Sequence, residues 1–156
     1  LSLHDALPRQ GVDFLVVDTP PHASTDAVEA ARCADLVLVP MEPHLFSLET
    51  LPKLDNLLKL AGDVPATFVV SKCSVQGREA RDAAEFIKGQ GFDVCPVTLH
   101  LRAAHRHAGN VGQTAQEYDP GGKAAEEAKQ VYMYTIKLLT KKGARRGQAK
   151  SAVPRA

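Results

Sequence analysis

Short apolar runs alternate with amphipathic stretches along most of the chain. Four of these runs, each short enough for a strand, lie within DFLVVDTPP, ADLVLVPMEP, ATFVVSK and DVCPVTL. Apolar residues at helical spacing predict helices near residues 24–33, 47–60 and 77–89, and a last helix over 123–139. Alternation of strands and helices is typical of a parallel sheet that is covered by helices. We therefore expect an α/β protein with a doubly wound, mainly parallel sheet and helices on both faces.

The first apolar run ends in an acid followed by two prolines. Residues 14–17 are all apolar and include two valines, which predicts a strand buried on both faces. Asp18 follows at the carboxyl end of this strand, the edge at which α/β proteins bind ligands. Pro20 and Pro21 remove two backbone donors, so the chain must turn stiffly out of the sheet. A carboxylate held there can orient a magnesium–water shell beside a phosphate. The alternative is an ordinary strand exit, with the acid as a helix cap or turn former.

The order of these segments resembles the ParA/MinD family of deviant-Walker P-loop ATPases, in particular the ParA-type partition ATPases of plasmids and chromosomes. DTPP followed at this spacing by ADLVLVP and FVVSK carries the resemblance, which covers roughly residues 11–139. It implies ATP and Mg²⁺ as ligands, a homodimer formed on ATP, nonspecific DNA binding and a centromere-binding, ParB-like adaptor. Two alternatives stay open: a MinD-like positioning ATPase, and a non-enzymatic flavodoxin-like binding module in which DTPP is only a turn.

The resemblance also assigns roles to single positions. The acid of DTPP matches the residue that orients the magnesium shell through water, and the three residues after it match the segment that senses the γ-phosphate. Ser71 and Lys72 stand where relatives have Asn and a basic residue that frames the adenine, and a hydroxyl reads the base less specifically than an amide. The residues expected near the nucleotide or its magnesium are Asp18, Thr19, Pro20, Pro21, Ser71, Lys72 and Pro120.

The phosphate loop of this family is missing from the sequence. No G-x-x-x-x-G-K-[ST] motif occurs in the 156 residues, although the backbone amides and lysine of such a loop bind the phosphates. The chain begins at Leu1, and residues 1–10 look unrelated to the family, so we expect a non-native or disordered leader there. We expect residues 11–139 to be the C-terminal portion of a ParA-type ATPase domain that does not hydrolyse ATP by itself.

Positive charge is concentrated at the C-terminal end of the chain. The net charge is +1, whereas residues 140–156 contain six Lys or Arg and no acid. Glycines and a proline in this segment predict a disordered tail. Such a tail suits salt-sensitive contact with DNA phosphates, and a merely solvated terminus is the alternative. The expected DNA or dimer contacts are Arg102, by resemblance, and Lys123, Arg145 and Arg146, by charge.

Composition also bears on location. The apolar runs are far too short to span a bilayer, and no signal peptide is visible, so we expect no membrane partner. Three cysteines without a CxxC spacing favour buried, reduced thiols in the cytoplasm. Together with the resemblance, this predicts a cytoplasmic, nucleoid-associated protein.

Overall fold

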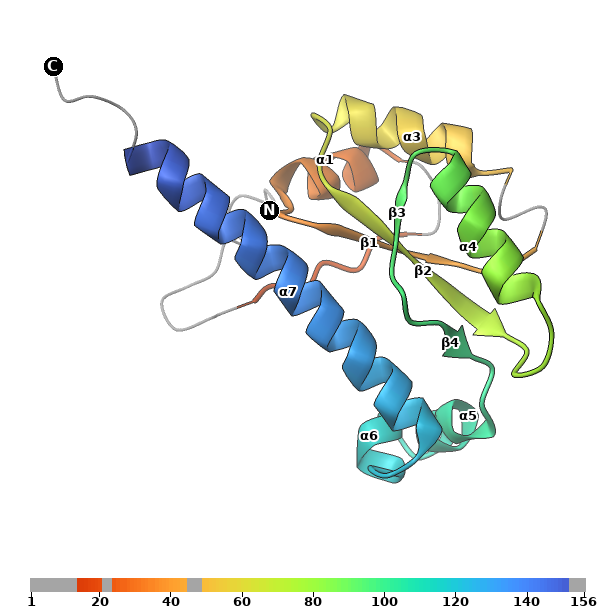
Figure 1. Cartoon of the computed structure of the whole chain (residues 1–156). Helices are drawn as coiled ribbons and strands as arrows, with labels where there is room; N and C mark the ends of the chain where they lie inside the picture. The colour runs from red at the N-terminus through yellow and green to blue at the C-terminus, as the bar shows by residue number, and fades with distance from the viewer. Residues whose placement is uncertain (1–13, 21–23, 45–48, 152–156) are drawn as a thin grey trace, which may run out of the picture.

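A small parallel sheet forms the centre of the fold (Figure 1). The computed structural model describes residues 14–20, 24–44 and 49–151, with the backbone alone from residue 141 onward. The strands of the sheet are β1 (Val37–Met41), β2 (Ala66–Cys73), β3 (Asp93–Val94) and β4 (Leu99–His100). β2 is central: it pairs with β1 on one side and with β3 and β4 in succession on the other, always in parallel.

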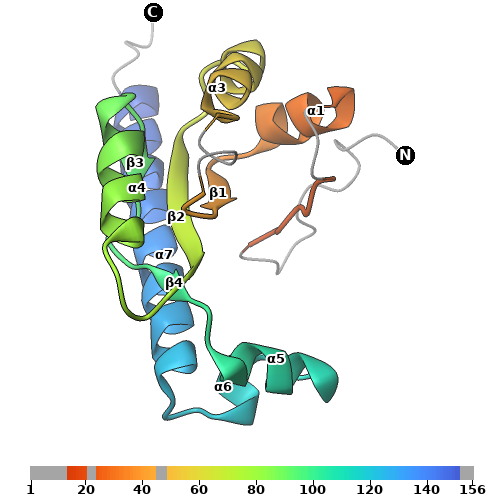
Figure 2. The ribbon, with the colours of Figure 1, turned by 90° about the vertical axis from the view of Figure 1, so that its right-hand side faces the viewer.

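Helices cover both faces of this sheet. The helices are α1 (Thr25–Cys33), α3 (Leu51–Leu60), α4 (Glu79–Gly89), α5 (Ala103–Asn110), α6 (Ala115–Tyr118) and α7 (Lys123–Ser151). In Figure 1, α3 and α4 lie on one side of the strands and α7 lies on the other; in Figure 2, α4 is seen in front of α7. The predicted α/β fold with a parallel sheet between helices is therefore confirmed, as are the helices expected near residues 24–33, 77–89 and 123–139.

The hydrophobic core lies between the sheet and helices α3 and α4. Phe68 and Val70 of β2 are almost completely buried against Ile87 of α4 and Leu51 of α3. The opposite face of β2 is also buried, because Thr67 is only 1% exposed. Burial on both faces explains why the TFVV run shows no polar alternation.

The outer edge of β1 has no partner strand among the described residues. Residues 14–17, which the sequence predicts as a buried strand, form no strand, so this prediction is wrong for the structure. Phe14 is 50% exposed and Val16 is 88% exposed. A strand buried on both faces needs ladder partners and a covering layer on each side, and the described residues provide neither. Leu38 of β1 is itself 43% exposed beside this open edge.

α7 is longer than the sequence pattern predicts. It continues through Ser151, whereas the sequence predicts a disordered tail from residue 140. The structure differs from this prediction over residues 140–151 because Lys, Ala, Arg and Gln all favour helix, and the two glycines weaken a helix without ending it. The predicted leader at 1–10 and the last five residues of the tail lie outside the described part of the chain. No helix in the described ranges has the length and apolar character needed to cross a bilayer.

Candidate functional site

The carboxyl ends of β1 and β2 bring two charged side chains together. The strands are parallel, with Met41 opposite Val70, so the residues that follow both strands reach the same edge of the sheet. There the Lys72 Nζ donates a hydrogen bond to Glu42 Oε1 at 2.6 Å. His44 Nε2 lies 3.8 Å from the other oxygen, Glu42 Oε2. The hydrogen bond from Lys72 holds the pKa of the Glu42 carboxyl below its usual range.

Lys72 occupies an irregular position in its strand. Ser71 pairs with Leu99 and Cys73 pairs with His100, so Lys72 is one extra residue on β2 opposite two consecutive residues of β4. Its φ is +54°, in the left-handed region that a residue with a Cβ rarely adopts. A bulge of this kind interrupts the ladder and redirects a side chain. Here it coincides with an exposed ammonium group that reaches the end of the neighbouring strand.

The other residues expected near a nucleotide are not brought into this cluster. Asp18, Thr19 and Pro20 are exposed in segment 14–20, which has no regular secondary structure, and Asp18 makes no side-chain hydrogen bond or ion pair with any described residue. Pro21 lies outside the described residues. Pro120 is exposed in the turn before α7, where Gly122 N donates to the Asp119 carbonyl at 3.0 Å, as the predicted turn requires.

These residues fit a magnesium nucleotide only in part. No group of three or more His, Cys, Asp or Glu side chains gathers in the described ranges, so the acid of DTPP is a single carboxylate that could hold Mg²⁺ only through water. The carboxyl edge thus offers the Lys72 ammonium group, the Ser71 hydroxyl, the Glu42 carboxylate and the His44 imidazole, and Asp18 is not part of this cluster.

A second polar cluster centres on Glu127 of α7. Its carboxylate accepts from the backbone N–H of His100 at 3.1 Å and lies 2.8 Å from His100 Nδ1. It also accepts from Arg102 Nε at 3.0 Å and Nη2 at 2.6 Å. Burial raises the pKa of the Glu127 carboxyl, but hydrogen bonds from Arg102 and His100 lower it more, and the pKa falls below its usual value. The cluster ties α7 to β4 and to the start of α5.

This cluster bears on the cations expected to contact DNA or a dimer partner. The Arg102 side chain is only 19% exposed and its guanidinium is bound by Glu127, so little of it is available to another molecule. Lys123 is exposed at the first residue of α7. The side chains of Arg145 and Arg146 lie outside the described part of the chain. Contact with DNA stays a prediction for all four residues.

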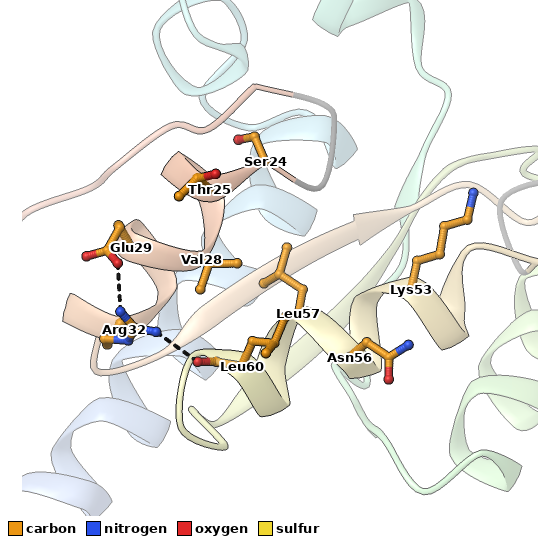
Figure 3. A pocket seen from close by; sticks show the side chains of 9 residues that line it. All are labelled: Ser24, Thr25, Val28, Glu29, Arg32, Lys53, Asn56, Leu57 and Leu60. Atoms are coloured by element: carbon orange, nitrogen blue, oxygen red, sulfur yellow. Dashed lines mark hydrogen bonds and ion pairs between the residues drawn. The ribbon is translucent and has the colours of Figure 1, made fainter.

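A groove of about 570 Å³ lies between α1 and α3 (Figure 3). Val28, Leu57 and Leu60 supply its apolar lining. At one end the Arg32 guanidinium binds Glu29 at 2.6 Å and the Leu60 carbonyl at 3.0 Å, which joins the two helices. These contacts are those of a helix–helix junction, and the groove contains none of the carboxyl-edge residues.

The three cysteines differ in environment. Cys73 and Cys95 are buried, as the sequence predicts, whereas Cys33 is exposed. Burial, followed by the negative charge of Glu79, raises the pKa of the Cys73 thiol to about 11. A thiol of that pKa is protonated at neutral pH, so Cys73 is not suited to nucleophilic chemistry.

Sequence reasoning missed the importance of Glu42 and Glu127. Glu42 pairs with a residue 30 positions away, and no local pattern reports such a contact. Glu127 did carry a signal: it stands three residues after buried Ala124 and four before half-buried Val131, on the side of α7 that faces the protein. A charged residue within an apolar helical stripe indicates a buried partner.

Comparison with known proteins adds no family assignment. No protein-family model matches the chain, and no curated protein matches it.

Proposed function

We propose that the chain is the C-terminal portion of a ParA-type DNA-partitioning ATPase, whose phosphate loop belongs to a segment outside these 156 residues. The parent protein would bind ATP with Mg²⁺, dimerise on ATP and bind DNA without sequence preference. Its partner would be a centromere-binding, ParB-like adaptor, and it would act in the cytoplasm on the nucleoid. The proposal rests on the order of the DTPP, LVLVP and FVVSK segments, and one structural observation supports it.

That observation is the outer edge of β1, together with the exposed apolar residues 14–17. The outer edge of β1 has no partner in the described part of the chain, and the all-apolar residues 14–17 are exposed. One further parallel strand between them would complete the ladder of β1 and would bury both Leu38 and Val16. In the proposed parent this strand leads into the phosphate loop, so the loop would emerge at the carboxyl edge that also carries Lys72 and Glu42.

The residues of the chain would then act around the bound nucleotide. Asp18 would orient the water shell of Mg²⁺, and Thr19 to Pro21 would respond to the γ-phosphate. Ser71 would frame the base from the end of β2, and Lys72 would lie beside it, close to the bound nucleotide. The bound Mg²⁺ supplies charge neutralisation for phosphoryl transfer to water.

The first test measures ATP turnover of the full-length protein. Asp18→Ala should lower magnesium-dependent turnover by roughly tenfold or more, because it removes the carboxylate that orients the metal shell. Asp26→Ala is the matched control, since Asp26 is also an exposed acid close in the sequence. Turnover that is equal in the two variants would reject the role of Asp18. The 156-residue chain alone should show no turnover above background.

The full gene provides an independent test of the same proposal. A GKT-type phosphate loop some tens of residues before Asp13 is the expected result. A native start codon directly before Leu1 would favour the non-enzymatic binding module.

A third test addresses DNA. The full-length, ATP-bound protein should bind unrelated duplexes equally, with an affinity that falls steeply with salt. Arg145→Ala/Arg146→Ala should flatten the log–log salt slope by about 2, because each phosphate contact contributes roughly −0.9. An unchanged slope would show that these cations do not contact DNA, and preference for one duplex would contradict nonspecific binding.

A further inference from the structure

Two basic side chains converge on a single carboxylate at the carboxyl edge of the sheet. Lys72 Nζ lies 2.6 Å from Glu42 Oε1, and His44 Nε2 lies 3.8 Å from Glu42 Oε2. The three side chains come from the ends of two adjacent parallel strands, the place where ligands bind in open α/β sheets. An anion with oxygens on both sides would find the Lys72 ammonium group and a ring nitrogen of His44 already placed there.

The backbone of Lys72 supports a functional reading of this arrangement. A left-handed φ is unfavourable for a lysine, and such conformations cluster at ligand sites. Here the bulge at Lys72 sends its ammonium group beyond the ladder toward the end of β1. A regular β2–β4 pairing would leave no extra residue at this position.

The contact with Glu42 is also easily replaced. The Lys72 side chain is 66% exposed and the Glu42 side chain is 37% exposed. Exposed ion pairs contribute little to stability, so their rupture costs little. A phosphate oxyanion bears more charge than a carboxylate and forms stronger charge-assisted hydrogen bonds with an ammonium group.

We propose that the Glu42 carboxylate is an internal substitute for a phosphate oxyanion. A polyphosphate displaces it from Lys72 and binds between Lys72 and His44, and the Glu42 side chain then turns into solvent. Anions of low charge do not displace Glu42 from Lys72, so Glu42 restricts the site to highly charged anions. The inference rests on the proposed function for the nature of the ligand, a nucleoside triphosphate, but its test does not require ATP hydrolysis.

The experiment uses the 156-residue chain and sodium tripolyphosphate as the probe. Side-chain carboxyl resonances, followed by carbon NMR, should shift for Glu42 on titration. Glu42→Gln should tighten tripolyphosphate binding about two- to fivefold, since a competing exposed pair of ordinary strength is removed. Lys72→Met should abolish the site, and Lys72→Arg should largely restore it.

The Asp55–Lys59 pair on α3 supplies a closely matched control. Its N–O distance is also 2.6 Å, and its side chains are 62% and 38% exposed, for Lys59 and Asp55 respectively. Asp55→Asn removes one negative charge, as Glu42→Gln does, but should leave tripolyphosphate binding unchanged. An equal gain in both variants would show a general charge effect and would overturn the proposal, as would a Glu42 resonance that does not move.

The outcomes also separate this inference from the proposed function. Displacement of Glu42 by tripolyphosphate, without ATP turnover by the full-length protein, would support the anion site and reject the ATPase. Turnover by the full-length protein with the same KM for ATP in the parent and the Glu42→Gln variant would support the ATPase and reject the role of Glu42.

Discussion

Removal of the Glu127 carboxylate tests how α7 is held on the sheet. Glu127→Ala leaves the Arg102 guanidinium and two N–H groups of His100 without their acceptor. Breaking a buried pair by removing one partner costs about 3–5 kcal/mol. The Glu127 side chain is 13% exposed and that of Arg102 is 19% exposed, so water replaces part of the lost contact. We therefore expect a loss of roughly 2–4 kcal/mol in the free energy of unfolding.

Urea unfolding followed by circular dichroism measures this loss, with Glu126→Ala as the control. Glu126 is the preceding residue of the same helix and is exposed, and its side chain accepts a hydrogen bond from Gln130 Nε2 one turn away, at 2.8 Å. Its replacement should change the free energy of unfolding by less than about 0.5 kcal/mol. Hydrogen exchange gives a second readout, because amides in the first turns of α7 should lose protection before those of β2.

A difference of less than about 0.5 kcal/mol between the two variants would refute the reasoning. It would mean that the cluster around Glu127 contributes no more than the surrounding apolar contacts of α7. An intermediate loss in Glu127→Gln is expected, because the amide keeps one acceptor oxygen but turns a donor toward Arg102.

Three further predictions concern single positions. The folded-state pKa of Glu127 is lowered, so its carboxylate stabilises the fold above the unfolded pKa of about 4.3, and this stabilisation is lost as pH falls through the folded pKa. The difference in Tm between the unmodified protein and Glu127→Gln should therefore shrink below about pH 5. A constant difference down to about pH 3 would contradict this. Lys72→Gly should be more stable than Lys72→Ala by about 1 kcal/mol, because glycine accepts the positive φ without strain; equal stabilities in urea would argue against that backbone conformation. Thr67→Val should stabilise the fold by about 1 kcal/mol, because the buried Thr67 hydroxyl has no hydrogen-bond partner among the described residues. A lower Tm would indicate an internal partner for the hydroxyl.

The sequence predicts the centre of this fold well because local and long-range preferences agree there. ATFVVSK is apolar on both faces, follows Pro65 and ends in a charged residue, and it forms the central strand β2. The segment at 93–99 is predicted as one strand but forms two short ones. Pro96 has no N–H to donate, and the ladder resumes only at Leu99.

Prediction fails where stability comes from contacts that a local pattern does not contain. The strand expected at 14–17 has the right composition but no neighbours in the described residues, and composition alone cannot form a ladder. α5 and α6 show no long apolar stripe. α6 is held by a capping box, in which Thr114 and Glu117 satisfy each other's backbone N–H groups.

The candidate site divides in the same way. The position of Ser71 and Lys72 at a carboxyl edge follows from the end of an apolar run, so sequence suffices for it. The partnership of Lys72 with Glu42 depends on the register of β1 and β2 and on one bulged residue. Such a contact emerges only when the strands are aligned in space.

The unpaired edge of β1 has a consequence for aggregation. Val37 N donates to the Pro65 carbonyl at 2.9 Å, so the backbone of Val37 turns toward β2. The backbone N–H and C=O groups of alternate residues in a strand point in opposite directions. The backbone polar groups of Leu38 and Pro40 therefore face the outer edge of β1. Pro40 has no N–H, so two copies that met edge to edge in antiparallel fashion would lose a donor at each proline. The residue that interrupts this edge therefore protects the chain against uncontrolled strand pairing, while an incoming parallel strand would lose a single hydrogen bond.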